Sequence, residues 1–405
     1  MSPVLPSEII ILIIDVVGEN EDTDLLKELA LLSHSFLQIC SKHIFATIEL
    51  KDTYSPSKRG FVKLLKSRPE VVKYIRKLTY NFGNNNFVDS DRLLLSILTN
   101  SLRSIHHINY LAMTSWSERL DWKKLDSSLT SALLHLMHLP TIKRINLSYI
   151  ENFPLSGLIP CVNLLRLDMF YLNHAHEDDD DFEIIPSEVV PKLREFRTIR
   201  SAVLTRKLLY AKMQDGQPAF NPINLRRLSL YPEDIEDKSR FRYLLQKAKL
   251  LEELRLEDGL KGGIVGLHDI LSPTACTLKV LHLTSSFLFP IFDVSTPARQ
   301  FCEELEAMAG HNVLEALSFA INICSSEKTE NDADDFVGTI IQNVGEIVVK
   351  TGWSDLRQVS FKVVRHARKG RAKLKALQSL TDKCLDHISK LESVQVTFSC
   401  EVRIF

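Results

Sequence analysis

The sequence predicts an α/β protein in which a small helical segment at the N-terminus precedes a long, irregular repeat with a parallel sheet and outer helices. Three observations support this prediction. The first fifty residues contain three short helical patterns. A strand-like spacing of apolar residues recurs eleven times from residue 75 onward. Helical stretches separate many of these units, and alternating strands and helices are typical of parallel sheets with helices packed outside them.

The first helical pattern follows Pro6 and continues to Val17. Pro6 favours a first helical turn, and Glu8 suits the positive N-terminal end of a helix. The residues from Ile9 onward are apolar on every side of that helix, so more than one face must be covered. Fifty residues provide little core of their own. We therefore expect this helix to pack on two other helices and to offer a face to another chain.

The apolar run is neither a signal peptide nor a membrane span by its pattern. No positive charge precedes it, and Asp15 interrupts a stretch far shorter than the roughly 20 residues that a bilayer requires.

Residues 24–37 predict a second helix, because apolar residues recur at helical spacing. Residues 39–45 predict a third, short helix, and residues 47–50 alternate as a strand does.

Residues 4–50 resemble an F-box domain, in the form common in large fungal families. The resemblance rests on Leu5, Pro6, Glu8 and Ile9, on the step Leu31-Leu32-Ser33, on the turn His43-Ile44-Phe45, and on Ile48 and Leu50. Phe36 stands where such domains usually carry Trp, which preserves the aromatic volume and removes an N–H donor. The alternative is a three-helix cap on a larger domain.

Length and composition limit the function classes. A chain of 405 residues exceeds the ~250–300 at which single cores usually divide. We predict an F-box-like domain at 1–50, a linker at 51–70 whose residues 51–60 are rich in turn formers, and a leucine-rich-repeat-like region at 71–405. The net charge of -1 favours neither nucleic acid nor an anionic membrane as a partner. Seven dispersed cysteines without a CxxC pair predict free thiols in a reducing compartment, the cytosol or the nucleus.

The repeat unit has an apolar residue followed by a second one three positions later and a third one two positions after that. Its eleven copies begin at Ile75, Ile105, Ile142, Leu164, Leu193, Leu225, Leu251, Leu278, Leu314, Leu356 and Leu391. The copy at Ile105 closes at Tyr110, and the copy at Leu391 closes at Val396. The mean step is about 32 residues, which lies within the range typical of repeat architectures.

The units at 224–230 and 250–256 resemble the strand segment of leucine-rich repeats, although the spacing is irregular and the asparagine ladder of that family is missing. The helices predicted between the strands are 61–67, 90–102, 128–139, 237–248, 296–308, 335–350 and 373–391. The resemblance implies a degenerate solenoid with a parallel sheet and outer helices. The alternative is a compact α/β domain whose strands share one core.

Side chains alternate along a strand, so the residues between the apolar ones are expected on the open face of the sheet. They are Arg144, Asn146, Arg166, Asp168, Phe170, Glu195, Arg197, Arg227, Ser229, Tyr231, Glu253, Arg255, Glu257, His282, Gln358, Ser360 and Lys362. Candidate target-binding residues among them are Arg166, Asp168, Phe170, Arg197, Arg227, Tyr231, Glu253, Arg255, Glu257 and His282. For any single residue, a solvated surface is the alternative.

The sequence predicts no catalytic residue, no metal site and no cofactor. The glycine cluster at 259–266 lacks the Lys-Ser/Thr pair of a phosphate loop. His135 and His138 lack an acidic partner at ligand spacing, and the segments at 174–181 and 331–335 are interpreted as a solvated insertion and an acidic loop before a helix. The basic run at 365–375 is interpreted as an exposed loop, with an acidic partner or nucleic acid as the alternative.

The F-box resemblance implies a substrate-recognition subunit of a cullin-RING ubiquitin ligase, in which the N-terminal helices dock on a Skp-type adaptor and the repeat region holds a protein target. The docking residues carried over from the resemblance are Leu5, Pro6, Ile9, Ile13, Leu31, Leu32 and Phe36. The chain would then perform no bond chemistry of its own. Two rivals stay open: a binding scaffold whose N-terminal segment only seals the repeat, and an active or nucleic-acid site at the acidic insertion or the basic run.

Overall fold

The computed structural model describes the chain from residue 6 to residue 404 with gaps. The described residues are 6–20, 22–50, 56–82, 107–115, 119–173, 184–185, 191–213, 216, 218–231, 235–257, 266–288, 295–310, 312–324, 330–350, 352–366, 372–389, 391 and 396–404. The fold is mixed α/β with a large parallel sheet. Its residues form two compact units, Met1–Lys192 with Tyr210–Phe220, and Leu193–Leu209 with Asn221–Phe405. The predicted helix at 90–102 lies outside the described residues.

Unit 1 begins with three helices and a strand, which are α1 (Ser7–Glu19), α2 (Thr23–Ala30), α3 (His34–Ile44) and β1 (Thr47–Leu50). Asp22 begins α2, because its carboxylate accepts a hydrogen bond from the backbone N–H of Leu25. The single helix predicted over residues 24–37 is wrong. The first of two helices in this range, α2, ends at Ala30. Ser33 has extended backbone, and its hydroxyl accepts a hydrogen bond from the N–H of Phe36, so a new helix, α3, starts there.

The rest of unit 1 alternates short helices with parallel strands. Its elements are α4 (Pro56–Ser67), η1 (Pro69–Tyr74), β2 (Lys77–Phe82), β3 (Tyr110–Ser115), β4 (Leu120–Asp121), η2 (Trp122–Lys124), α6 (Ser127–Met137), β5 (Arg144–Ser148), β6 (Ile150–Glu151), η3 (Leu155–Leu158), β7 (Arg166–Phe170), β8 (Ile184–Ile185) and β10 (Lys212–Met213). The strand order of its main sheet is β1-β2-β3-β5-β7, and every neighbouring pair is parallel. Two short parallel pairs, β4–β6 and β8–β10, form separate two-stranded sheets.

Part of the segment predicted as a linker is helical. α4 occupies Pro56–Ser67, and its Val62 and Leu65 are buried. Proline is well accommodated in the first turn of a helix, because its missing N–H would have had no helical partner there. The helix predicted at 61–67 therefore lies within α4, which starts earlier, at Pro56, and the domain boundaries at 50 and 70 stay a prediction.

Unit 2 repeats a strand-helix order. Its elements are β9 (Glu195–Ile199), α7 (Ala202–Tyr210, shared with unit 1 at its last residue), η4 (Pro222–Asn224), β11 (Arg227–Leu230), α8 (Ile235–Lys247), β12 (Glu253–Glu257), α9 (Leu267–Leu271), η5 (Ser272–Thr274), β13 (Val280–Leu288), α10 (Ser295–Met308), β14 (Ala316–Cys324), α11 (Glu330–Lys350), β15 (Gln358–His366), α12 (Ala372–Ser389) and β16 (Thr397–Ile404). The strand order is β9-β11-β12-β13-β14-β15-β16, parallel throughout.

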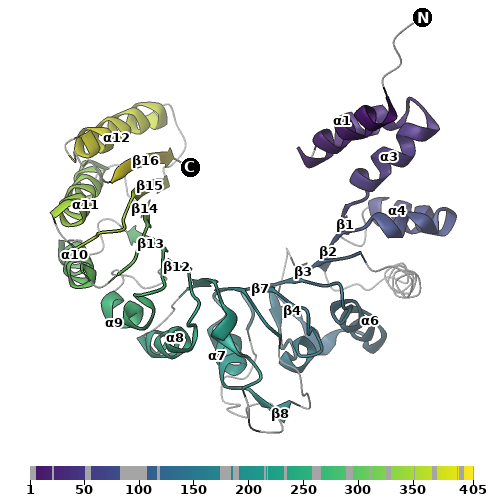
Figure 1. The fold of residues 1–405 in the computed structure, drawn as a ribbon, viewed down its shortest axis with the longest axis horizontal. Helices are drawn as coiled ribbons and strands as arrows, with labels where there is room; N and C mark the ends of the chain where they lie inside the picture. Colours follow the sequence, from purple (N-terminus) through teal and green to yellow (C-terminus); the bar gives the residue numbers. More distant parts are fainter. Residues whose placement is uncertain are drawn as a thin grey trace, which may run out of the picture. The chain divides into compact units, whose positions relative to one another are not determined.

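The helices of unit 2 from α8 to α12 lie along one side of its strands (Figure 1). The strand residues that face them are apolar and buried, including Leu254, Leu281, Phe319 and Phe361. Phe319 and Phe361 come from neighbouring strands, and their rings stack with centroids 5.5 Å apart. The opposite face of the strands is polar, as the alternation along each strand predicts.

The predicted spacing matches the observed strands in nine of the eleven repeat units and is out of frame in two. In β3, Tyr110 aligns with Lys77 and Arg144, so it lies on the polar face, while Leu111 and Met113 are the buried residues. The unit predicted at 391–396 precedes its strand, because Thr397 aligns with Gln358. The strand is held in that frame by Phe398 and Cys400, which align with Val359 and Phe361 of the helix-covered face.

Candidate protein-binding surfaces

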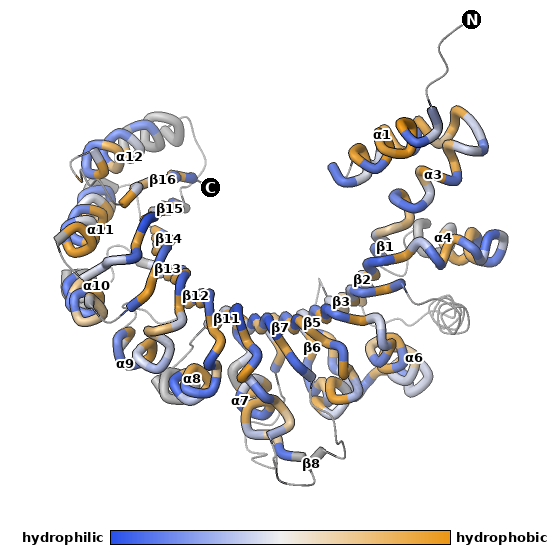
Figure 2. Tube along the Cα trace, in the orientation of Figure 1, coloured by the Kyte–Doolittle hydropathy of each residue, from blue (hydrophilic) through white to orange (hydrophobic). Residues whose placement is uncertain are grey.

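The first candidate site is an apolar surface on α1, α2 and the turn before α3. Sixteen large apolar side chains are exposed in the described part of the chain, and eight of them lie between residues 9 and 32. We call these eight the N-terminal apolar surface: Ile9, Ile11, Leu12, Ile13, Val16, Leu25, Leu31 and Leu32. Single exposed apolar residues are ordinary, but eight within one short segment are typical of an interaction surface. Figure 2 shows the apolar character of α1 along most of its length.

A small core behind this surface holds the three helices together. Ile14, Leu26, Ala30 and Cys40 are buried in it, one or two from each helix. Neighbouring apolar residues of all three helices, Phe36 among them, pack against it while remaining partly exposed. The helices therefore bury only part of their apolar side chains among themselves, which leaves the rest on the surface.

Polar contacts hold α1 against α3. One carboxylate oxygen of Asp15 lies 2.6 Å from Nζ of Lys42 and 2.7 Å from Nε2 of His43. The hydrogen bond from Lys42 is the main cause of the lowered pKa of Asp15; burial opposes it, and His43 adds to it. At Gly18, a Cβ would collide with the His43 ring, so glycine permits this close approach of the two helices. The orientation of α1 is thus fixed by contacts outside the N-terminal apolar surface.

The predicted docking residues fall mostly on this surface. Ile9 and Ile13 are 41% and 49% exposed, and Leu31 and Leu32 are 87% and 68% exposed. Pro6 is also exposed, at the residue before α1. Leu5 lies outside the described residues.

The exposed surface and the predicted docking residues are not the same set. Phe36 packs against the helical core, which limits its contact with a partner. The selection also missed Leu12, Val16 and Leu25, which are exposed at 60%, 50% and 39%. The apolar run of the first helix was visible in the sequence, but which of its sides α2 and α3 cover depends on how the helices pack.

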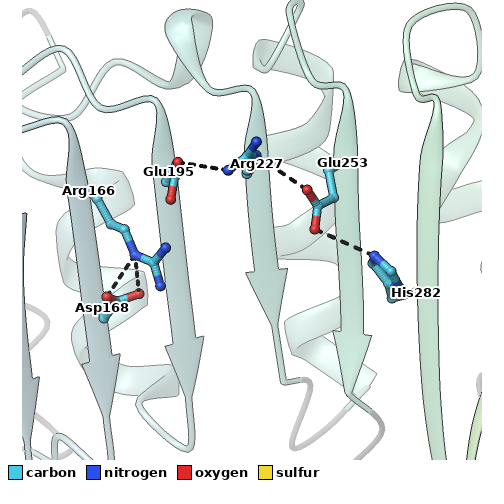
Figure 3. Close-up of polar contacts among 6 residues, drawn as sticks. All are labelled: Arg166, Asp168, Glu195, Arg227, Glu253 and His282. Atoms are coloured by element: carbon cyan, nitrogen blue, oxygen red, sulfur yellow. Dashed lines mark hydrogen bonds and ion pairs between the residues drawn. The ribbon is translucent and has the colours of Figure 1, made fainter. Parts of the chain in front are cut away.

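The second candidate site is the polar face of the sheet, which in unit 2 carries a row of alternating charges (Figure 3). Arg227 on β11 lies 3.2 Å from Glu195 on β9 and 3.3 Å from Glu253 on β12. His282 on β13 lies 3.5 Å from Glu253. Burial is the main cause of the lowered pKa of His282; Arg255 also lowers it and Glu253 opposes both, so the imidazole is held towards its neutral form.

A second contact in unit 2 joins Arg197 to Glu257 at 3.1 Å. Tyr231 makes a cation–π contact with Arg200, whose guanidinium carbon lies 5.6 Å from the centre of the tyrosine ring. Arg255 is partly exposed on β12. The charges of this face in unit 2 are therefore largely paired with one another.

The polar face of unit 1 has a different balance of charge. Arg166 donates from Nε to both carboxylate oxygens of Asp168, at 3.1 and 2.9 Å, and Asp168 is buried (Figure 3). Phe170 lies farther along β7 on the same face and is partly exposed. All ten predicted target-binding residues are thus described on the polar face or at its end. Seven of them are in contact with another member, in the pairs Arg166–Asp168, Arg197–Glu257, Arg227–Glu253 and His282–Glu253, which the sequence could not specify.

Other sequence candidates have structural roles or lie outside the described residues. His138 donates a hydrogen bond from Nε2 to the carbonyl oxygen of Gly157 at 2.9 Å. The acidic segment at 331–335 is the start of α11 rather than a loop, and Asp334 is buried beside Arg365 at 3.1 Å. Arg365 belongs to β15 and is buried, so the basic run does not begin in an exposed loop. The insertion at 174–181 and residues 259–265 lie outside the described residues.

In the described ranges, no group of three His, Cys, Asp or Glu residues is placed to hold a metal ion. No helix in those ranges is long and apolar enough to cross a membrane. No protein-family model matches the chain, and no curated protein is significantly similar to it.

Proposed function

We propose that this protein is an F-box-type substrate-recognition subunit of a Skp/cullin ubiquitin ligase. The N-terminal apolar surface docks on a Skp-type adaptor, and the polar face of the sheet, a degenerate leucine-rich-repeat-like solenoid, holds a protein target. Other subunits of the ligase perform the ubiquitin transfer, and this chain performs no bond chemistry. The place of action is the cytosol or the nucleus.

The observation that carries this proposal is the concentration of exposed apolar side chains on α1 and on the turn at Leu31 and Leu32. Leaving such side chains in water forgoes about 1.5–3 kcal/mol for each fully exposed leucine, which a partner can recover. Behind them the three helices have their own buried core, so the surface is not simply an unfolded end. An apolar docking surface on a pre-formed support fits an adaptor contact.

The polar face supports the second half of the proposal. It carries charged and aromatic side chains on neighbouring strands, and no described helix of unit 2 covers that side (Figure 1). Such a surface suits recognition of another protein, since polar and charged groups contribute specificity more than affinity.

One observation favours the alternative, a binding scaffold whose N-terminal helices only seal the sheet. β1 pairs in parallel with β2, with Thr47 opposite Lys77, so the helices are continuous with the edge of the unit 1 sheet. Solenoid ends require such caps. A cap and a docking surface are compatible, but a cap alone predicts no adaptor binding.

The deciding experiment is a pull-down of the purified full-length chain with a purified Skp-type adaptor. The test variant is Leu12→Glu, which places a charge in the middle of the N-terminal apolar surface at a 60% exposed position. We expect the wild-type chain to retain the adaptor and the variant to lose it, since a buried unpaired carboxylate is costly.

The matched control is Leu250→Glu, because Leu250 is 48% exposed and lies in unit 2. It should bind the adaptor as the wild type does. Wild-type chain that binds no adaptor at micromolar concentration would reduce the segment to a cap. Equal loss of binding in both variants would also reject the assigned surface.

A further inference from the structure

The polar face of unit 1 contains a row of cationic and aromatic side chains in which Arg166 is paired with Asp168, while Lys77 and Arg144 have no carboxylate partner among the described residues. Lys77, Tyr110, Arg144 and Arg166 come from β2, β3, β5 and β7, and they are aligned with one another by the register of the four strands. We call these four residues the basic row. Residues in register on adjacent strands lie about 5 Å apart, so the row extends over roughly 14 Å.

Only one carboxylate of these four strands lies on the same face. Asp168, on β7, is buried and holds Arg166 by hydrogen bonds to both of its oxygens. On β1 the face also carries Glu49, which is aligned with Thr79 rather than with the basic row. Among the described residues, no carboxylate lies within ion-pair distance of Lys77 or Arg144, and both side chains are exposed.

Contacts on this face orient the two arginines of the row. The Arg144 guanidinium lies 5.3 Å from the centre of the Tyr110 ring, which is within range of a cation–π interaction. Burial raises the pKa of the Tyr110 hydroxyl, which also hydrogen-bonds Asn146. Asp168 orients Arg166 through hydrogen bonds to both of its carboxylate oxygens. Guanidinium groups that are oriented before binding lose less entropy when they hydrogen-bond a carboxylate or a phosphate.

Unit 2 provides the internal comparison. At the same register position, Arg227 has Glu195 on one side and Glu253 on the other, at 3.2 and 3.3 Å. Arg227 on the polar face of unit 2 is therefore paired with two carboxylates within the sheet, whereas Lys77 and Arg144 on the polar face of unit 1 have no carboxylate partner among the described residues.

We propose that the basic row is a binding site for an extended acidic segment of a partner protein. Resting on the proposed function, this inference identifies the class of target: a peptide whose carboxylates or phosphates meet Lys77, Arg144 and Arg166, with its chain lying across the strands. Alternate side chains of an extended peptide lie about 7 Å apart, so two or three acidic side chains of a peptide that crosses the strands fall within the roughly 14 Å of the row. Arginine and lysine are the side chains that bind such anions most strongly.

A peptide fits this row better than a nucleic acid. The row holds three cations with a carboxylate among them, and the chain as a whole has a net charge of -1. Nucleic-acid interfaces usually carry a larger excess of positive charge spread over many phosphate contacts. The row is short and includes a partly buried tyrosine, which suits a few acidic side chains.

The test is fluorescence anisotropy with the full-length chain at low and at physiological ionic strength. The probes are a labelled peptide with glutamate at alternate positions, the same peptide with phosphoserine at those positions, its lysine counterpart, and a single-stranded oligonucleotide. We expect the two anionic peptides to bind, the lysine peptide not to bind, and the affinity to fall as salt rises. The ratio of the first two affinities distinguishes a carboxylate-rich target from a phosphorylated one.

Variants assign the binding to the row. Arg144→Gln and Lys77→Gln should each weaken the acidic peptide at least about tenfold, because each removes a charge-assisted hydrogen bond. Lys66→Gln removes an exposed cation of α4, outside the polar face of the sheet, and should leave the affinity unchanged. Both test positions are exposed, and a thermal unfolding curve for each variant verifies that the fold is retained.

Three results would overturn the inference: no binding of either anionic peptide at low salt, equal losses in Arg144→Gln and Lys66→Gln, or an oligonucleotide that binds more tightly than both peptides through Arg144. The adaptor pull-down is independent of this result. A chain that retains the adaptor and ignores the peptides refutes the basic row alone, and a chain that binds the peptides without the adaptor refutes the ligase proposal alone.

Discussion

The double substitution Leu31→Ala/Leu32→Ala separates docking from folding, because these are the most exposed leucines of the described chain. At 87% and 68% exposure they contribute little to the folded state, and each truncation should change the free energy of unfolding by no more than about 0.5 kcal/mol. If a partner buries both side chains, it gains about 1.5–3 kcal/mol for each fully covered leucine.

Weighting that gain by the exposed fractions gives a loss of about 2–4 kcal/mol in binding, after allowance for the methyl group that alanine retains. This corresponds to a roughly 30- to 1,000-fold increase in Kd for a Skp-type adaptor. The assay is isothermal titration of the full-length chain with the adaptor, together with a urea unfolding curve for each protein. The loss should appear mainly as faster dissociation.

The control is Leu250→Ala, which truncates a 48% exposed leucine outside the N-terminal segment. It should leave the Kd unchanged. An unchanged Kd in the double variant would refute the assignment of Leu31 and Leu32 as anchors. A large drop in unfolding free energy would refute the premise that their exposure in the free chain makes them dispensable for folding.

Three further predictions concern the support of the two surfaces. Asp334→Ala should lower the free energy of unfolding by about 3–5 kcal/mol in a urea titration, because it removes the carboxylate that faces the buried Arg365 at 3.1 Å. Gly18→Ala should cost about 1–3 kcal/mol in the same assay and weaken adaptor binding, because its Cβ would push α3 away from α1. Since the hydrogen bond from Lys42 lowers the pKa of Asp15 in the folded chain, the stability it provides is complete above the unfolded pKa of about 4 and is lost as pH falls through the lower folded value. Asp15→Asn should therefore be less stable than wild type by up to about 1 kcal/mol at pH 7, and the difference should vanish in thermal melts at strongly acidic pH.

Each of these predictions has its own control. For Asp334, the neighbouring exposed pair of Lys383 and Asp335 tests the role of burial, and Lys383→Ala should cost less than about 1 kcal/mol. A Gly60→Ala variant has open space around its Cβ and should be neutral or slightly stabilising in α4. A stability difference for Asp15→Asn that stays constant down to strong acid would contradict the ion-pair explanation.

Most of the strand pattern could be predicted from the sequence because the unit recurs. Leu225, Leu228 and Leu230 are buried as the spacing indicates, and β11 to β15 follow the same frame. The frame was wrong around Tyr110, because the residues from Ile105 and those from Ile108 both fit the pattern. Only pairing with β2 decides between them, and pairing is a contact between distant residues.

The candidate sites depend more strongly on tertiary structure. The break between α2 and α3 comes from one side chain, Ser33, whose capping competes with continuation of an apolar helical pattern. The exposure of Leu12 follows from which side of α1 the other helices cover. The contrast between Arg144 and Arg227 follows from strand register, because only register decides which side chains have a carboxylate beside them.

The central claim is that the N-terminal apolar surface docks on a Skp-type adaptor, and amide hydrogen exchange of the full-length chain with and without the adaptor tests it most directly. The account predicts slower exchange in Ser7–Glu19 and across Leu31 to Phe36 when the adaptor is present, with no change in β12 to β16. Unchanged exchange in those N-terminal segments at saturating adaptor, or protection confined to the sheet, would contradict the claim.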